Sequence, residues 1–336
     1  MTIRPGPRNL LTDVPGFRVG NAEDGSAITG VSVVLPDAPA VAAVDVRGGG
    51  PGTRETDALA PGRLVERVDA VVLSGGSAFG LAAADAAMVW LAERGRGFQV
   101  GDFRVPIVPA AVLFDLANGG DKAWGAEPPY ARLARLACDA AALDFALGNA
   151  GAGMGAKAGD IKGGLGSASA VDDDGLAVAA LVAANPVGSA TYPGQSTLWA
   201  WALEQGGEMG GQAPPTAAAD LEPDFPFLRG LAAGGNTTLA VVATNADLGR
   251  GEALRVAMMA QDGFARAIRP AHTPFDGDTA FVLASATHAL AEPRAMAVAR
   301  IGALAADCVA RAIGRAIVLA ESAGAFTSWR ERFGKG

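Results

Sequence analysis

One run of apolar residues, 176–184 (LAVAALVAA), restricts the possible folds more than any other part of this sequence. It follows Asp174-Gly175, a pair typical of hairpin turns, and it stops at Asn185-Pro186. A strand without a polar face has to be covered on both sides by other layers of structure. The run therefore predicts a strand in the interior of a layered protein, with Asn185 at the end of its sheet.

Segments typical of strands and helices alternate along the rest of the chain. At 336 residues, half of them hydrophobic, the chain is long enough to bury a substantial core. The apolar periodicity and the positions of Gly and Pro predict the elements of this fold. Residues 68–97 are expected to form a strand, a turn at 74–77 and a helix. Further strands are expected at 105–116 (irregular), 238–244 and 279–285, and further helices at 251–268 and 292–322. We expect an α/β fold of the α+β type, with helices outside packed sheets, in a single domain spanning 1–336.

Charge and composition argue against several classes of protein. The net charge is −8 and no dense Lys/Arg cluster occurs, so we expect neither nucleic-acid nor membrane partners. The start, MTIRPGPRNL, has no apolar stretch typical of a secretory signal. The two cysteines, Cys138 and Cys308, are far apart and lie in helical contexts, which favours buried free thiols. We therefore expect a cytoplasmic protein.

Familiar cofactor and metal patterns do not fit this sequence. The stretch GGSAFG (75–80) lacks the second glycine of a nucleophile elbow, and neither His272 nor His288 stands in a triad pattern. The glycine-rich tract at 148–169 matches neither the phosphate-binding loop nor the dinucleotide fingerprint. No Cys and His spacing suits zinc. We expect no cofactor and no metal.

The stretch GGNTTLAVVATN (234–245) suggests a nucleophile that needs no histidine. A threonine at the start of a chain can use its own α-amine as the base, since that amine has a pKa of roughly 7.7–8.0. An internal threonine reaches this state only if the preceding peptide bond breaks. Gly234 and Gly235 permit a distorted Asn236–Thr237 bond, and the strand behind anchors the other side. On this stretch alone, a plain turn into a strand is the favoured interpretation, since such sequences are common.

A second stretch, HTPFDGDT (272–279), adds a pair of carboxylates. Asp276 and Asp278 stand two residues apart just before a predicted strand, so on an extended backbone both face the same side. There they could orient the hydroxyl of Thr237 and hold its ammonium. A solvated Asp-Gly turn is the alternative interpretation.

With these two stretches, the chain resembles the DmpA/β-aminopeptidase family of self-cleaving N-terminal nucleophile hydrolases, which includes nylon-oligomer hydrolases and a pantetheine hydrolase. The matching blocks are GGGPGTRETDAL (48–59), VDAVVLSGGSAFGL (68–81), VPIVPAAVLFDL (105–116), GAGMGAKAGDIKGGLGSAS (151–169), NPVG (185–188), GNTTLAVVATN (235–245) and HTPFDGDT (272–279). The resemblance implies a four-layer αββα sandwich and an oligomer of processed αβ units.

The same resemblance assigns roles to individual residues. It implies self-cleavage between Asn236 and Thr237 into fragments 1–236 and 237–336, with Thr237 as the nucleophile. Asp276 and Asp278 match the paired acidic residues of the family. Asn185 matches an amide that stabilises the oxyanion, a role that an N–H donor at a strand end can perform.

Two positions depart from the family or are ambiguous. Phe114 stands where nylon-oligomer hydrolases have a tyrosine, which removes a phenolic hydrogen bond from the substrate pocket. The family lysine corresponds to Lys157 or Lys162, of which we favour Lys162. The resemblance thus implies a cofactor-free amidohydrolase or aminopeptidase for small linear amides or peptides. An acyltransferase of similar fold and a non-catalytic, uncleaved ligand-binding protein are the alternatives.

Overall fold

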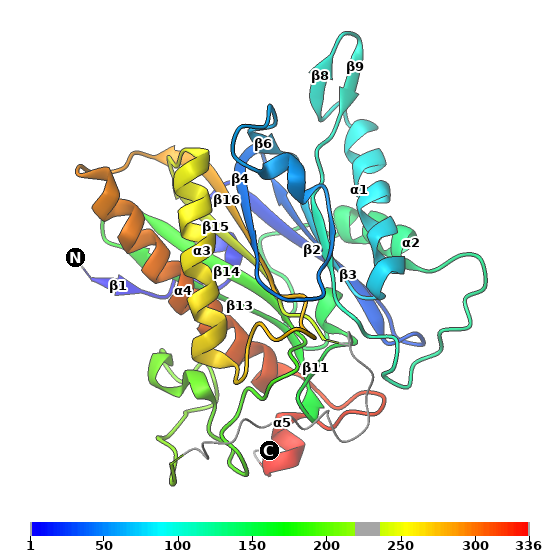
Figure 1. The fold of residues 1–336 in the computed structure, drawn as a ribbon, viewed down its shortest axis with the longest axis vertical. Helices are drawn as coiled ribbons and strands as arrows, with labels where there is room; N and C mark the ends of the chain where they lie inside the picture. The colour runs from blue at the N-terminus through cyan, green and yellow to red at the C-terminus, as the bar shows by residue number, and fades with distance from the viewer. Residues whose placement is uncertain (1, 219–235, 335–336) are drawn as a thin grey trace.

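The protein is built from two β-sheets packed face to face between two layers of helices (Figure 1). The computed structural model describes residues 2–218 and 236–334. The larger sheet has the strand order β1-β13-β14-β15-β16-β4-β6 and the smaller one the order β2-β3-β7-β10-β5. The predicted αββα sandwich is confirmed by this arrangement.

The strands of the larger sheet are β1 (Ile3–Arg4), β4 (Ala40–Val46), β6 (Arg67–Val68), β13 (Gly164–Asp172), β14 (Ala177–Ala184), β15 (Leu239–Ala246) and β16 (Thr279–His288). Those of the smaller sheet are β2 (Phe17–Asp24), β3 (Thr29–Pro36), β5 (Gly52–Arg54), β7 (Val71–Ser74) and β10 (Ala110–Val112). Two short ladders pair β8 (Phe98–Val100) with β9 (Phe103–Val105) and β11 (Lys157–Ala158) with β12 (Ile161–Lys162). The helices are α1 (Ala82–Ala92), α2 (Tyr130–Asp139), α3 (Arg250–Ala267), α4 (Arg294–Leu319) and α5 (Trp329–Phe333).

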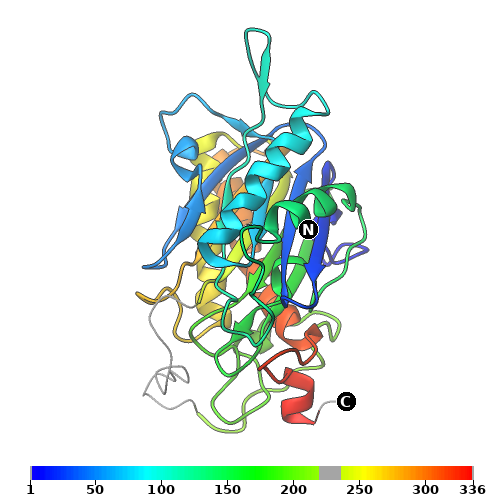
Figure 2. The same ribbon diagram turned by 90° about the vertical axis from the view of Figure 1, so that its right-hand side faces the viewer.

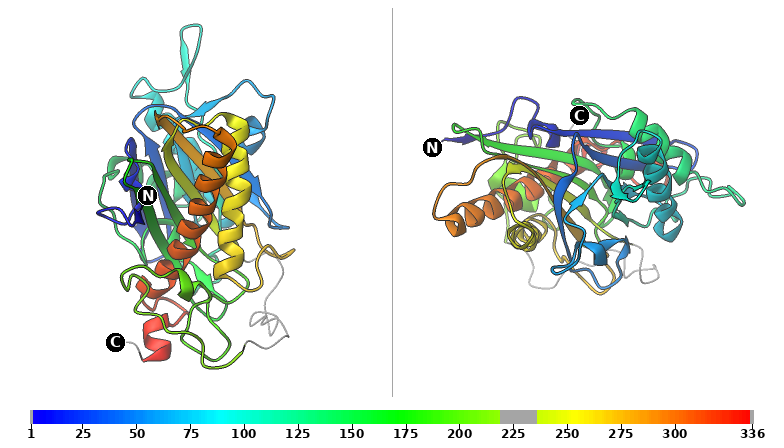
Figure 3. Two further views of the ribbon diagram at one scale, coloured as in Figure 1. Left: turned by 90° about the vertical axis from the view of Figure 1, so that its left-hand side faces the viewer. Right: turned by 90° about the horizontal axis from the view of Figure 1, so that it is seen from above.

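Helices cover the outer face of each sheet. Figure 3 shows α3 and α4 side by side over the larger sheet, and Figure 2 shows α1 and α2 over the smaller one. None of the helices in the described ranges has the length and apolar character needed to cross a bilayer. Cys138 and Cys308 are both buried free thiols, as predicted.

Strand β14 shows why the sheets need covers on both faces. All its residues are buried. Val178, Ala180 and Val182 pack in the core beneath α3 and α4. Ala179, Leu181 and Ala183 pack in the core between the two sheets. The strand predicted from the run 176–184, with its hairpin turn, is therefore confirmed.

Small residues let the layers approach closely. Gly166 of β13 lies under α4, where a Cβ atom would stand 1.9 Å from the carbonyl oxygen of Ala312. The strand predicted over 105–116 is shorter than expected: Val105 ends β9, and β10 covers only Ala110–Val112. Pro106 and Pro109 have no backbone N–H to donate to a ladder, which accounts for the irregular first half.

Candidate active site

Two strand registers place Thr237 at the centre of the site. In the antiparallel pair β14–β15, Ala183 lies opposite Leu239, so continuing the register brings Asn185 opposite Thr237. In the parallel pair β15–β16, Leu239 lies opposite Thr279, so Gly277 falls on the other side of Thr237. The backbone of Thr237 is thus flanked by the end of one strand and the beginning of another.

Backbone hydrogen bonds hold the peptide bond before Thr237 on both sides. The N–H of Thr237 donates to the carbonyl oxygen of Asn185 at 2.7 Å, and the N–H of Gly277 donates to the carbonyl oxygen of Asn236 at 3.1 Å. The hydroxyl Oγ1 of Thr237 lies 2.5 Å from that same Asn236 oxygen. Both Asn236 and Thr237 are buried. The hinge predicted at Gly234 and Gly235 lies outside the described residues.

Asp276 and Asp278 are both buried beside this peptide bond. Asp278 accepts the N–H of Thr238 through Oδ1 at 2.8 Å. Asp276 accepts the N–H of Val187 through Oδ1 at 3.0 Å, and the N–H and Oγ1 of Thr273 through Oδ2 at 3.0 and 2.6 Å. Each carboxylate is therefore held rigidly by donors on the loops around Thr237.

The two carboxylates influence each other's ionisation. Burial and, to a smaller extent, the neighbouring charge of Asp278 together raise the pKa of Asp276 to about 6, against the hydrogen bonds from Thr273 and Val187. Two like charges in a buried site do not ionise independently. The pair can therefore take up a proton near neutral pH, as a group that moves protons needs to do.

The side-chain amide of Asn185 is fixed in one orientation. The N–H of Lys157 can only donate, and it donates to Oδ1 of Asn185 at 2.9 Å. The NH₂ group is thereby directed the other way, where Nδ2 donates to the carbonyl oxygen of Phe114 at 3.3 Å. That group has two N–H bonds, so one bond positions the amide and a second can stabilise an oxyanion. Phe114 contributes to the site through its backbone, which a tyrosine-to-phenylalanine change does not alter.

The two lysines of the glycine-rich tract occupy different environments. Lys162 is fully buried, and its Nζ donates to the carbonyl oxygens of Gly153 at 3.0 Å and Gly163 at 2.8 Å. Burial lowers the pKa of Lys162 to about 7, against the opposing influence of Asp115. Lys157 contacts Asn185 through its backbone, and burial also lowers its pKa. The preference for Lys162 as the site lysine stays a prediction.

Two residues of the site were missed in the sequence. His272 begins the block HTPFDGDT, and its Nδ1 lies 2.9 Å from Oδ2 of Asp278. The triad pattern does not reveal this role, and the spacing of six residues between His272 and Asp278 is the signal that the sequence offers. Gly277 has no side chain to suggest a role, and its N–H became recognisable only through the register of β15 with β16.

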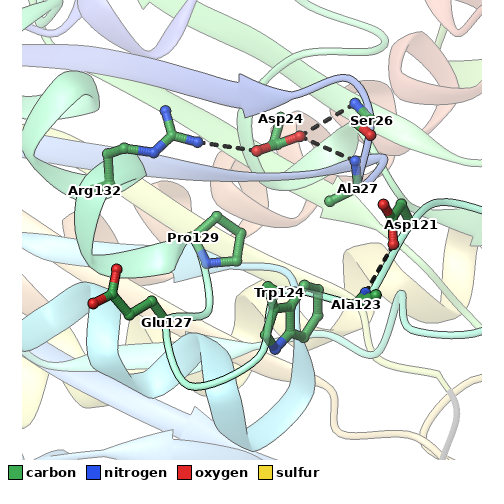
Figure 4. Close-up of a pocket in the computed structure, with 9 residues that line it drawn as sticks. All are labelled: Asp24, Ser26, Ala27, Asp121, Ala123, Trp124, Glu127, Pro129 and Arg132. Atoms are coloured by element: carbon green, nitrogen blue, oxygen red, sulfur yellow. Dashed lines mark hydrogen bonds and ion pairs between the residues drawn. The ribbon is translucent and has the colours of Figure 1, made fainter.

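A separate hollow of about 360 Å³ lies between the turn that joins β2 to β3 and the loop that leads into α2 (Figure 4). Two of its three carboxylates already serve the fold. Asp24 caps the N–H groups of Ser26 and Ala27 and pairs with Arg132 at 3.0 Å, and Asp121 caps Ala123. None of the predicted site residues lines this hollow. Within the described ranges, no group of three or more His, Cys, Asp or Glu side chains is arranged to hold a metal ion.

Comparison with known protein families gives a match over nearly the whole chain. The model of peptidase family S58 matches residues 9–329. An uncharacterised aminopeptidase of Mycobacterium tuberculosis is 43% identical over 97% of this chain and 98% of its own length. A 6-aminohexanoate-oligomer endohydrolase of a Kocuria species is 30% identical over 83% of this chain and 75% of its own. The match to the family model extends over all the blocks that carry the resemblance seen in the sequence.

Solved structures share the architecture. A β-aminopeptidase of a Burkholderia species superposes with a TM-score of 0.71 at 24% identity, covering 98% of this chain and 93% of that one. The L-aminopeptidase D-Ala-esterase/amidase of Ochrobactrum anthropi, described as a variant of the N-terminal nucleophile hydrolase fold, gives 0.69 at 22% identity and covers 95% and 88%. The fold of these hydrolases is therefore the fold of this chain.

Proposed function

This chain belongs to peptidase family S58, as its motifs predicted, and we propose that it is a cofactor-free amidohydrolase that generates its own nucleophile by cleavage between Asn236 and Thr237. The observation that carries the proposal is the position of Thr237 Oγ1, 2.5 Å from the Asn236 carbonyl oxygen and beside two buried carboxylates. A threonine that served only to begin a strand would not need this arrangement.

Self-cleavage would start with attack of Thr237 Oγ on the carbonyl carbon of Asn236. The oxygen of that carbonyl becomes negative, and the N–H of Gly277 already donates to it. The hydroxyl proton passes to the nitrogen of Thr237 as that nitrogen leaves, which gives an ester. Water then hydrolyses the ester, restoring the hydroxyl and releasing a carboxylate at Asn236 and an α-amine at Thr237.

Substrate hydrolysis would use the new α-amine as the base. Asn185 already accepts a hydrogen bond from this nitrogen, so the amine stays next to its own hydroxyl after cleavage. The hydroxyl attacks the substrate carbonyl, the second N–H of the Asn185 amide stabilises the oxyanion, and the leaving amine takes the proton. Water then hydrolyses the acyl-enzyme. Asp276 and Asp278 would hold the ammonium form of the amine close to the nucleophile.

The first step is tested on purified protein. SDS gels and intact mass should show two pieces in place of the 33.6 kDa chain. Edman sequencing of the smaller piece should read Thr-Thr-Leu-Ala. Thr237→Ala should abolish both cleavage and hydrolysis. A single 33.6 kDa band in preparations that hydrolyse amides at full rate would overturn the proposal.

The second step is tested on the processed enzyme with a panel of amides. We propose small linear amides or peptides as substrates, and the panel should include α-peptides, β-peptides, 6-aminohexanoate oligomers and pantetheine. Adding a competing amine distinguishes hydrolysis from acyl transfer, since a transferase would give the new amide in place of the free acid. A homo-oligomer of processed αβ units and a cytoplasmic location remain predictions.

A further inference from the structure

The imidazole of His272 is bound to one of the two carboxylates next to Thr237. Its Nδ1 lies 2.9 Å from Oδ2 of Asp278, and its backbone N–H donates to the same oxygen at 3.0 Å. The other oxygen, Oδ1, accepts the N–H of Thr238 at 2.8 Å. Asp278 is thus fixed between His272 and the backbone that follows the cleavage site.

The backbone of His272 is strained to make this contact. Its φ angle of +55° lies in the left-handed region, which few residues other than Gly, Asn, Asp and His adopt. Two donors of one residue reach a single carboxylate oxygen in this conformation. Such strain at a residue with a specific polar contact is typical of a functional position.

The environment of the second ring nitrogen, Nε2, indicates which tautomer of the imidazole fits between Asp278 and the core. Nε2 is buried and has no hydrogen-bond partner in the described part of the chain. An N–H on Nε2 would be buried without a partner, so the tautomer with the hydrogen on Nδ1 fits this place. In that tautomer the ring is a donor to the carboxylate of Asp278.

The other charged groups nearby do not take over this role. Asp276 is bound by Thr273 and Val187 instead. Arg47 donates only its backbone N–H to the carbonyl oxygen of Asp278, while its guanidinium pairs with Asp45 at 2.7 Å. After cleavage, the α-amine of Thr237 is the cation that the reaction adds beside this carboxylate.

We propose that His272 is a positioning residue that holds Asp278 as the anion facing the new amine terminus. It acts through Asp278 and does not touch the reacting bond. The inference rests on the proposed function, because only a cleaved chain has an ammonium next to Asp278. The competing explanation is that the ring only fills space against Phe264, whose ring centroid is 5.4 Å away.

Three variants separate these explanations. His272→Asn tolerates the left-handed backbone and keeps a donor near the position of Nδ1. His272→Gly also tolerates this backbone but removes the donor. Phe264→Leu is the matched control, because it removes the ring contact and leaves the hydrogen bond to Asp278 intact. Each variant is examined by intact mass, Tm and the pH dependence of kcat/KM with an amide found active in the panel.

Loss of the hydrogen bond from His272 should raise the pKa of the first protonation of the carboxylate pair, Asp276 and Asp278. In His272→Gly we expect the acid limb of kcat/KM to move up by about one pH unit, with kcat reduced about tenfold. His272→Asn should stay within about threefold of the wild type, and Phe264→Leu should lower Tm without moving the acid limb. Equal losses in His272→Gly and His272→Asn, with an unmoved acid limb, would refute the inference. An uncleaved or inactive wild type would instead refute the proposed function.

Discussion

Gly277 offers the sharpest test of the self-cleavage geometry, because its place leaves no room for a side chain. A Cβ atom there would stand 2.5 Å from Oγ1 of Thr237, 3.0 Å from the carbonyl oxygen of Gly50 and 3.2 Å from Cα of Pro51. Ordinary contacts begin near 3.4 Å. Since Gly50 and Pro51 block a retreat to the other side, Gly277→Ala should push the hydroxyl away by about 1 Å.

The cost of this displacement can be worked from the geometry. A misplacement of about 1 Å lowers the rate of a reaction between positioned groups about 10²-fold, which equals about 2.7 kcal/mol of activation free energy. The N–H of Gly277 remains in the variant, so its bond to the Asn236 oxygen is not removed. We therefore expect self-cleavage of Gly277→Ala to be about 10²-fold slower than that of the wild type.

The assay follows the loss of the 33.6 kDa precursor on gels after synthesis in a cell-free system. Gly251→Ala in α3 is the control, since a Cβ atom there meets nothing within 4 Å. It should cleave at the wild-type rate and gain about 0.5–1 kcal/mol in helix stability. In the double variant Thr237→Ala, Gly277→Ala, the chain has no Oγ1 for the new methyl group to contact. The change in Tm that Gly277→Ala causes in this uncleavable chain therefore reports only the strain against Gly50 and Pro51. Cleavage of Gly277→Ala at the wild-type rate would refute the reasoning.

Three further predictions concern the residues around Thr237. Asn185→Asp keeps the acceptor for the Lys157 N–H but loses the amide donor, so kcat should fall about 10²–10³-fold in steady-state assays. Lys162→Met should lower Tm, because two buried carbonyl groups lose their donor at about 1–3 kcal/mol each, whereas Lys157→Met should change Tm little. A loss of hydrolysis confined to Lys157→Met would make Lys157 the site lysine. Because burial and Asp278 raise the pKa of Asp276 to about 6, this carboxyl is ionised above that pH, and kcat/KM should fall as the pH drops through about 6. A profile that stays flat down to pH 5 would contradict this role.

The sequence was informative wherever local chemistry alone determines structure. The run 176–184 predicted a strand with two buried faces because it follows a hairpin turn and has no polar face, and β14 has that environment. Helix α4 was predicted at 292–322 and spans Arg294–Leu319, since its apolar positions recur at helical spacing over many turns. In both cases the pattern is repeated often enough to outweigh local exceptions.

The contacts inside the site could not be predicted in this way. That Asn185 and Gly277 flank Thr237 depends on the order and register of β14, β15 and β16, which no local pattern encodes. The important donors are backbone N–H groups, and every residue except proline has one. The side chain of Asn185 was predicted as an oxyanion donor from the resemblance, but its fixation by Lys157 and Phe114 required the fold.

The geometry around Thr237 also suggests that one hydroxyl serves two reactions with separate oxyanion donors. In the proposed self-cleavage the negative oxygen would be that of Asn236, which the N–H of Gly277 already contacts from the β16 side. In the proposed turnover the amide of Asn185 would approach the substrate carbonyl from the end of β14. If the donors are separate, Asn185→Asp should still mature into two fragments while losing hydrolysis, and Gly277→Ala should fail first in maturation. Loss of maturation in Asn185→Asp, with Tm unchanged, would mean that both reactions share a single oxyanion site.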